Sequence, residues 1–298
     1  MTTSPQIQEI VIITGASSGI GEATARELAR RGFHVLAGVR RDQDADAIRG
    51  LGIEPLILDI TNPDHIRALA ARVHEDPQGR AVRALVNNAG IGVNAPVEVF
   101  AIDEWRQLFE VNFFGHIAVI QTLLPALIRS KGRVVNISSV GGKIAMATYG
   151  PYAGTKFALE AISDALRREV ESLGVKVIVV EPGAVKTEML GRVASTGERI
   201  TSGMTTEQRG RYATLMHAII SQAQAAIPTG VSAEEAGRVI ADAIASKRPR
   251  TRYTVGREAA LLPLLAILPD RMLDRIFAAA LRRHYWNGPP LVPEDGLS

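Results

Sequence analysis

Short apolar runs alternate along the chain with longer stretches in which apolar residues recur every three or four positions. The short runs are rich in β-branched residues and predict seven buried strands, at 9–14, 33–38, 54–58, 84–87, 133–138, 176–181 and 252–255. The longer stretches predict intervening helices, among them 21–31, 64–74, 152–172 and 233–246. Such alternation is typical of β-α-β units, so we expect an α/β fold: one doubly wound, Rossmann-type domain over residues 1–298, with a seven-stranded parallel sheet and helices on both faces.

Two segments depart from this alternation of strands and helices. Residues 187–230 are longer than an ordinary strand-to-helix connection and contain a helical pattern at 206–225. Since they follow the carboxyl end of a strand, where doubly wound folds bind ligands, we expect a lid insertion. A helical cover over the sheet edge is the alternative. The second segment, 256–298, is a C-terminal extension with a helical apolar face made of Leu273, Ile276, Phe277, Ala280, Leu281 and Tyr285.

Composition excludes several classes of function. The chain has 298 residues, 46% of them hydrophobic and 22% charged, which is typical of a globular protein. It contains no cysteine, so disulfides, thiol nucleophiles and cysteine-held metals are impossible, and a cytoplasmic location is expected. The histidines lack metal-ligand spacing, and neither a Gly-x-Ser-x-Gly elbow nor a P-loop occurs. No signal peptide is evident, and no apolar run approaches the roughly 20 residues of a membrane span.

A glycine-rich turn follows the first predicted strand and opens the first predicted helix. Its residues are Thr14, Gly15, Ala16, Ser17, Ser18, Gly19, Ile20 and Gly21. Glycines at such a junction permit a tight turn and close approach of the backbone, and the free N–H groups of the helix start attract a pyrophosphate. The turn therefore indicates a dinucleotide site, although its spacing departs from G-x-G-x-x-G.

Further motifs support this interpretation. The sequence resembles the short-chain dehydrogenase/reductase family, whose TGxxxGxG motif matches 14–21, whose NNAG motif matches 87–90 and whose Tyr-x-x-x-Lys pair matches Tyr152 and Lys156. The resemblance extends from about residue 9 to residue 255, and the sequence most resembles the hydroxysteroid and retinol dehydrogenase branch of the family. Other residues that fit the family are Asn112, Ser139, Pro182, Gly183 and Thr187.

The residue that ends the second predicted strand bears on the choice of nucleotide. Arg40 stands there, where a carboxylate favours NAD and a guanidinium accommodates the 2′-phosphate of NADP. We therefore expect NADP(H), with a solvated surface arginine as the alternative. Asp59 resembles the family's residue near the adenine ring, and a helix cap is equally plausible. The resemblance extends the cofactor site to Gly15, Ser17, Ser18, Gly19, Ile20, Gly21, Asn88, Ala89, Gly90, Tyr152, Lys156, Pro182, Gly183, Val185 and Thr187.

Hydride transfer to a carbonyl needs a proton source beside the nicotinamide. Tyr152 and Lys156 are four residues apart in a helical stretch and share a face, so the ammonium could lower the pKa of the phenol from about 10 to about 7. By resemblance, Tyr152 is the general acid/base and Lys156 lowers its pKa and binds the nicotinamide ribose. Ser139 then holds the substrate oxygen and Asn112 completes a water-linked proton relay. Ser138 is the rival of Ser139, but the spacing to Tyr152 favours Ser139.

The residues expected around the substrate are largely apolar, which favours a lipophilic alcohol or ketone of the hydroxysteroid, retinol or lipid type. They are Val93, Pro96, Val140, Ile144, Met146, Thr148, Tyr149, Met189, Leu190 and parts of 204–216. A ketoacyl thioester reductase of the same family is one alternative. A non-catalytic NADP-binding sensor or scaffold is another.

The chain carries a net charge of +3, and the segment 247–286 is distinctly basic. Its helical part is expected to dock on the substrate cleft or on a second subunit. Peripheral contact with an anionic membrane is the alternative, and nucleic acid is not expected as a partner. The resemblance also implies a homo-oligomer, formed through the helix that carries Phe157, Leu159, Ile162 and Leu166.

Overall fold

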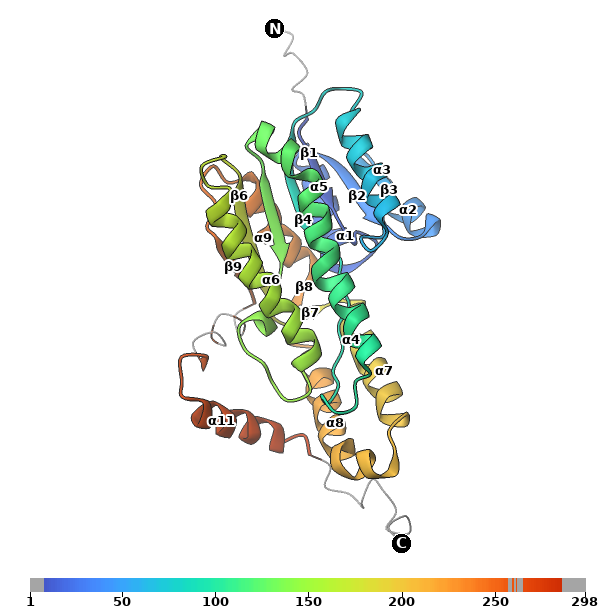
Figure 1. Cartoon of the computed structure of the whole chain (residues 1–298), viewed down its shortest axis with the longest axis vertical. Helices are drawn as coiled ribbons and strands as arrows, with labels where there is room; N and C mark the ends of the chain where they lie inside the picture. Colours follow the sequence, from blue (N-terminus) through green and yellow to red (C-terminus); the bar gives the residue numbers. More distant parts are fainter. Residues whose placement is uncertain (1–7, 257–258, 260, 262–264, 286–298) are drawn as a thin grey trace.

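The computed structural model describes residues 8–256, 259, 261 and 265–285. All seven predicted strands are present, and they form one parallel sheet in the order β3-β2-β1-β4-β5-β6-β9 (Figure 1). Their bounds are Ile10–Ile13 (β1), His34–Val39 (β2), Ile53–Ile57 (β3), Val82–Asn87 (β4), Arg133–Ile137 (β5), Lys176–Pro182 (β6) and Arg252–Val255 (β9). The doubly wound fold is therefore confirmed.

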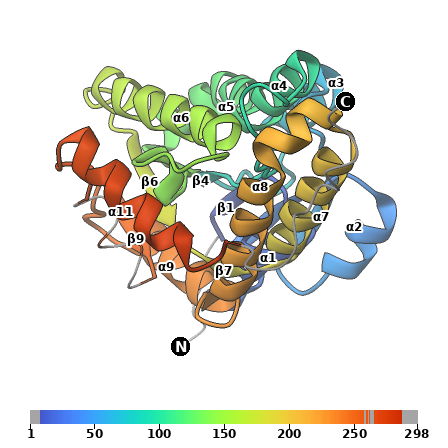
Figure 2. The same cartoon turned by 90° about the horizontal axis from the view of Figure 1, so that it is seen from below.

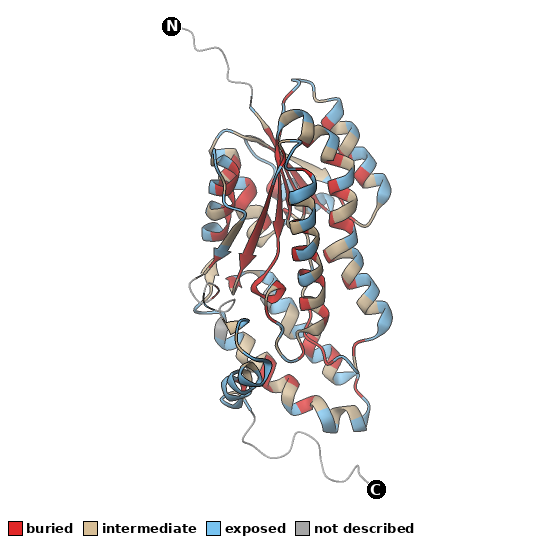
Figure 3. Cartoon of the chain, turned by 60° about the vertical axis from the view of Figure 1, so that its left-hand side comes forward, coloured by how far each residue is buried: buried red, intermediate tan, exposed pale blue. Residues whose placement is uncertain are grey.

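Helices cover both faces of the sheet because side chains alternate between its two faces along each strand. Val11 and Ile13 of β1 belong to one core cluster, into which α1, α2 and α9 pack. Ile10 and Ile12 belong to the other, into which α3, α5 and α6 pack. These helices are α1 (Gly19–Arg30), α2 (Asp42–Ile48), α3 (Pro63–His74), α5 (Gly115–Ser130), α6 (Gly150–Glu169) and α9 (Ala233–Ala245). The central strands are accordingly buried throughout (Figure 3).

A long helical stretch crosses one side of the molecule. It consists of α4 (Ile102–Phe109), a π-helical turn (Glu110–Phe114) and α5. It is long enough to span a membrane, and an 18-residue window within it has a mean hydropathy of 1.6. A core helix meets the same criteria. Val119 and Leu123 of α5 are buried against the sheet, so we interpret the stretch as part of the core.

The insertion after the sixth strand is a pair of helices, which we call the lid hairpin. It consists of α7 (Glu188–Ser202) and α8 (Thr206–Ala226), flanked by the short strands β7 (Val185–Lys186) and β8 (Val231–Ser232), which pair with each other. The hairpin lies beyond the carboxyl ends of the central strands rather than along an edge strand (Figures 1 and 2). The sequence predicted α8 but neither α7 nor the small sheet.

The C-terminal extension is described only in part, and its remaining residues lie outside the described structure. Its helix α11 (Asp270–Arg282) lies against α8, where Leu281 is buried beside Ala218 and Ile219. Most of the predicted apolar face is not covered: Ile276 is exposed and Phe277 is half-buried. Tyr285 follows the helix rather than belonging to it, so docking on α8 involves only one end of the predicted face.

Candidate active site

The glycine-rich turn has the backbone that its sequence predicts. Gly15 and Gly19 have φ angles of 65° and 58°, a left-handed region that favours glycine. Gly21 is required for a different reason, since a Cβ there would lie 2.3 Å from the Gly15 oxygen and 2.5 Å from Asn88 Nδ2. The residues at the start of helix α1 lie at the carboxyl edge of the sheet, where they line a cavity.

Hydrogen bonds join this turn to the turn after β4. Thr14 Oγ1 accepts from the backbone N–H groups of Asn88 and Ala89, both at 3.0 Å. Asn88 Nδ2 donates to the oxygens of Thr14 at 3.0 Å and Gly15 at 2.8 Å. The NNAG motif therefore holds the glycine-rich turn in place.

A cavity of about 330 Å³ opens over these two turns. Eleven of the residues predicted for the cofactor line it: Gly15, Ser17, Ser18, Gly19, Ile20, Arg40, Asp59, Asn88, Ala89, Gly90 and Thr187. The other lining residues are Met189, which the sequence predicted for the substrate, and nine that it did not predict: Val39, Leu58, Ile60, Thr61, Ile91, Gln107, Glu110, Val111 and Arg192. Several of these flank predicted residues along the chain, but no pattern pointed to Gln107, Glu110 or Arg192.

Asp59 lines the cavity, and it does not cap a helix. Asn62 caps α3 instead, by accepting from the N–H of Asp64. Asp59 Oδ1 accepts from the N–H and the hydroxyl of Thr61 at 2.9 and 2.7 Å. Burial opposes ionisation of Asp59, but these bonds and the charge of Arg40 outweigh it and lower the pKa of the carboxyl.

Arg40 is exposed at the end of β2 and lines the cavity. Its neighbour Arg41 is held by Asp44 through two hydrogen bonds of 2.8 and 2.9 Å. Within the described part of the chain, Arg40 makes no hydrogen bond or ion pair of its own. Its guanidinium is therefore available to an anionic ligand in the cavity.

Asn112 is completely buried in the π-helical turn, where the widened backbone interrupts the α-helical register. Its Oδ1 accepts from the N–H of Ile91 at 2.9 Å, and its Nδ2 donates to the Ile91 oxygen at 2.8 Å and to Thr155 Oγ1 at 3.2 Å. Asn112 thereby ties the chain after β4 to helix α6. A Cβ on Gly90 would lie 3.4 Å from Asn112 Oδ1 and 3.9 Å from Lys156 Nζ.

Lys156 is buried in α6, and its Nζ donates to the backbone oxygen of Ile137 at 2.9 Å. The same Nζ lies 5.7 Å from the centroid of the Tyr152 ring. Burial lowers the pKa of Lys156 to about 8, although the charge of Glu160 one turn along the helix opposes this shift. Lys156 and Tyr152 are therefore neighbours, as the sequence predicted.

Tyr152 and Ser139 also meet. The Ser139 hydroxyl lies close enough to the phenols of Tyr152 and Tyr149 to lower the pKa of each. The two rings contact edge to face at 5.3 Å, and Ser139 Oγ accepts from the N–H of Gly141 at 3.0 Å. Burial and then the nearby Tyr149 raise the pKa of Tyr152, and the bond with Ser139 only partly offsets them. In the polypeptide the pKa of Tyr152 is therefore raised rather than lowered to about 7, and the charge of Lys156 is not among the causes of the shift.

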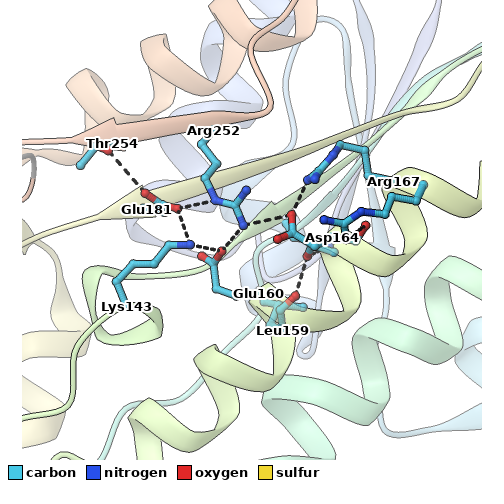
Figure 4. A network of polar contacts seen from close by, with 11 residues as sticks. Lys143, Leu159, Glu160, Asp164, Arg167, Glu181, Arg252 and Thr254 are labelled. Atoms are coloured by element: carbon cyan, nitrogen blue, oxygen red, sulfur yellow. Dashed lines mark hydrogen bonds and ion pairs between the residues drawn. The ribbon is translucent and has the colours of Figure 1, made fainter. Parts of the chain in front are cut away.

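A network of charged side chains joins α6, β6 and β9 (Figure 4), and the carboxylates of Glu160 and Glu181 are its buried members. Arg252 binds Glu160 at 2.9 Å and Glu181 at 3.1 Å, and Lys143 binds the same two carboxylates at 2.8 and 3.4 Å. Burial and the charge of Glu160 raise the pKa of Glu181. The sequence analysis did not single out these residues, because their partners are far apart in the chain.

The segment after β6 lies against the glycine-rich turn. The N–H of Gly183 donates to the Val255 oxygen at 3.0 Å, and Val185 is buried within the small sheet. Thr187 reaches the turn itself, since a Cβ on Gly19 would lie 2.9 Å from Thr187 Cγ2. Pro182, Gly183 and Val185 support the cavity and do not line it.

The lid hairpin packs on the loop after β4 through an apolar cluster made of Val93, Ala95, Phe100, Leu108, Ile200, Met204 and Met216. Of the residues predicted to surround the substrate, Val93 and Met204 lie in this cluster and Met189 lines the cavity. Val140 and Ile144 are buried beside Ser139 along the chain. The side chain of Leu190 lies outside the described structure.

A parallel doubly wound sheet, a glycine-rich turn that opens a helix and a neighbouring group of Ser139, Tyr152 and Lys156 define the class of dinucleotide-dependent oxidoreductases. The sequence model of short chain dehydrogenases matches residues 9–198. The chain belongs to the short-chain dehydrogenase/reductase family, whose members named below are oxidoreductases.

Known proteins are similar to this chain over nearly its whole length. An NADPH-dependent 3-dehydrocapnine reductase of Ornithobacterium rhinotracheale is 33% identical, with 91% of this chain and 97% of the relative covered. Retinol dehydrogenase 5 of Mus musculus is 35% identical over 94% of this chain and 91% of its own. Among solved structures, a short-chain dehydrogenase from Streptomyces avermitilis superimposes with a TM-score of 0.70 at 27% identity, covering 93% of this chain and 96% of that one.

Proposed function

We propose that the protein is an NADP(H)-dependent oxidoreductase that transfers hydride between the nicotinamide and a lipophilic alcohol or ketone. The observation that carries the proposal is the meeting of Tyr152, Ser139 and Lys156 at the carboxyl edge of the sheet. The Gly90 backbone connects this group to the cavity over the glycine-rich turn, because Lys156 Nζ and Gly90 are close neighbours.

The residues present suit the nucleotide. Gly15 and Gly19 let the backbone approach a pyrophosphate, and the start of α1 offers N–H groups to it. Arg40 offers a guanidinium that no described carboxylate pairs with, which favours a 2′-phosphate over a bare ribose. A relative that is 33% identical is named as NADPH-dependent. When bound, the nicotinamide supplies or accepts the hydride.

The chain's own residues would manage the proton and the substrate oxygen. Ser139 donates a hydrogen bond to the carbonyl oxygen, and Tyr152 gives it a proton as the alcohol forms. A phenol whose pKa is raised by burial keeps its proton at neutral pH and is therefore ready to act as the acid. Lys156 holds its charge near the pair and Asn112 maintains the geometry of the turn that carries it.

The exposed apolar side chains of Ile91 and Met189, which line the cavity, favour a lipophilic substrate of the hydroxysteroid, retinol or lipid type. One relative is named a retinol dehydrogenase. The test is oxidation of NADPH and NADH by the purified protein with steroid ketones, retinal, medium-chain aldehydes and ketoacyl thioesters. The expected result is Tyr152-dependent use of NADPH with one lipophilic class.

Other results of that panel would point elsewhere. Turnover confined to ketoacyl thioesters would make the protein a thioester reductase of the same family. Tight binding of NADPH with no turnover of any carbonyl would favour a non-catalytic sensor or scaffold and would contradict the proposal.

The exposed face of α11 is a separate proposal about partners and location. Met272 and Ile276 are exposed there, and Arg271, Arg275, Arg282 and Arg283 surround them. An apolar stripe with a basic rim suits the surface of an anionic membrane, so we propose a cytoplasmic protein with peripheral membrane contact. Sedimentation with anionic vesicles tests it: replacement of the four arginines by glutamine should release the protein, and unchanged sedimentation would contradict the proposal.

We likewise propose a homo-oligomer, formed through α6 and the π-helical turn that precedes α5. Phe114 and Phe157 are 51% and 44% exposed, which is unusual for such large apolar side chains. The sequence analysis had also assigned Leu159 to this face, but Leu159 is buried in the core of the subunit.

A further inference from the structure

We propose that Arg192, on the lid hairpin, is a second specificity-determining residue for the 2′-phosphate, which it would bind together with Arg40. The inference rests on the proposed use of NADP(H). It differs from the sequence analysis, which assigned nucleotide specificity to Arg40 alone.

The first turns of α7 are packed onto the cofactor cavity. A Cβ on Gly92 would lie 2.8 Å from Val193 Cγ2 and 3.6 Å from Met189 Cγ, and Thr187 contacts Gly19. Met189 and Arg192 line the cavity whose opposite wall carries Arg40. The fold therefore brings the lid hairpin and the end of β2 to one opening, although more than 150 residues separate them.

The charges around this opening show that the two arginines act on the same region. Asp44 is paired with Arg41, and after that pair the charges of Arg40 and Arg192 also lower the pKa of its carboxyl. The charges of three arginines thus act on Asp44, and only Arg41 is in contact with it. Arg41 is already bound to Asp44, which leaves Arg40 and Arg192 to meet an added dianion.

Arg192 has one described partner, Glu188, one turn earlier in α7. Both side chains are about two-thirds exposed, and an exposed pair on one helix contributes little to stability. A phosphate carries more charge than a carboxylate and accepts paired N–H groups, so it can replace Glu188 as the partner of Arg192. Binding of the 2′-phosphate would then link the lid hairpin to the body of the protein.

The experiment is a fluorescence titration of the full-length protein with NADPH and with NADH, which needs no substrate. For Arg192→Gln we expect about tenfold weaker binding of NADPH, or about 1.4 kcal/mol, and less than a twofold change for NADH. The matched control is Arg199→Gln, on the same helix. Arg199 pairs with Glu104 at 2.7 Å, away from the cavity, and its replacement should alter neither affinity.

A second variant tests the exchange of partners. Glu188→Gln removes a competing negative charge beside the phosphate, so it should tighten NADPH binding about two- to threefold and leave NADH unaffected. Equal weakening of both nucleotides by Arg192→Gln would overturn the inference, since Arg192 would then only support the lid. Unchanged binding of NADPH by Arg192→Gln would also overturn the inference.

Arg40→Gln separates this inference from the proposed function. If the wild type prefers NADPH and Arg40→Gln abolishes the preference while Arg192→Gln does not reduce it, only the role of Arg192 is wrong. If the wild type binds both nucleotides equally and Arg40→Gln changes nothing, the NADP(H) proposal fails and the inference fails with it.

Discussion

Replacement of Arg252 by methionine tests the charge network behind the active site. Arg252 binds three carboxylates, and two of them, Glu160 and Glu181, have side chains that are only 7% and 5% exposed. Breaking a buried ion pair by removing one partner costs about 3–5 kcal/mol. Because Lys143 still contacts both carboxylates, we expect Arg252→Met to lower the free energy of unfolding by about 3 kcal/mol at pH 7.5, near the lower end of that range.

The loss should depend on pH in a defined direction. The pKa of Glu181 is raised in the folded protein, so its ionisation destabilises the fold as pH rises through that pKa. Removal of Arg252 raises the pKa further, which increases the penalty at neutral pH. The deficit of the variant should therefore shrink as pH falls from 7.5 toward 5, where the carboxyl binds a proton.

Urea unfolding followed by tryptophan fluorescence at several pH values provides the measurement. Arg199→Gln is the control, because it removes an exposed pair worth about 1 kcal/mol or less. A deficit below about 1 kcal/mol for Arg252→Met at pH 7.5, or one that stays constant down to pH 5, would refute the reasoning.

Three further predictions concern the site and the assembly. Because burial brings the pKa of Lys156 to about 8, the rate of NADPH oxidation should fall above that pH in a pH–rate profile. Glu160→Gln removes the negative charge that opposes this shift, so the fall should begin at a lower pH in that variant. Gly21→Ala should weaken nucleotide binding at least tenfold in a titration, since its Cβ would collide with the Gly15 oxygen and Asn88; unaltered affinity would contradict the assigned turn geometry. Phe157→Glu should reduce the mass measured by light scattering if α6 forms the subunit interface, and an unchanged mass would exclude that interface.

Much of the fold could be predicted because its strands are short apolar runs with β-branched residues, which few other structures accommodate. Helix α7 was missed for the opposite reason: Gly191 and Gly197 interrupt its sequence, and its apolar residues are few. Packing of Ile200 onto the loop after β4 stabilises it, and such a distant contact leaves no local pattern.

The candidate site shows the same division. The motifs identified Tyr152, Lys156 and Ser139, which the fold brings together. The sequence could not show that desolvation raises the pKa of Tyr152, opposite to the lowering expected from Lys156. Nor could it show that the π-helical turn places Asn112 against Ile91, or that Arg192 reaches the cavity, since both depend on the three-dimensional arrangement.

Comparison of Tyr152→Phe with the wild type tests the central claim most directly. Phenylalanine keeps the ring that packs on Tyr149 and removes only the hydroxyl. We predict that the variant binds NADPH with unchanged affinity while kcat with its best carbonyl substrate falls by about 10²–10⁴, the usual contribution of a general acid. A variant that binds NADPH normally and retains near-normal turnover would contradict the account.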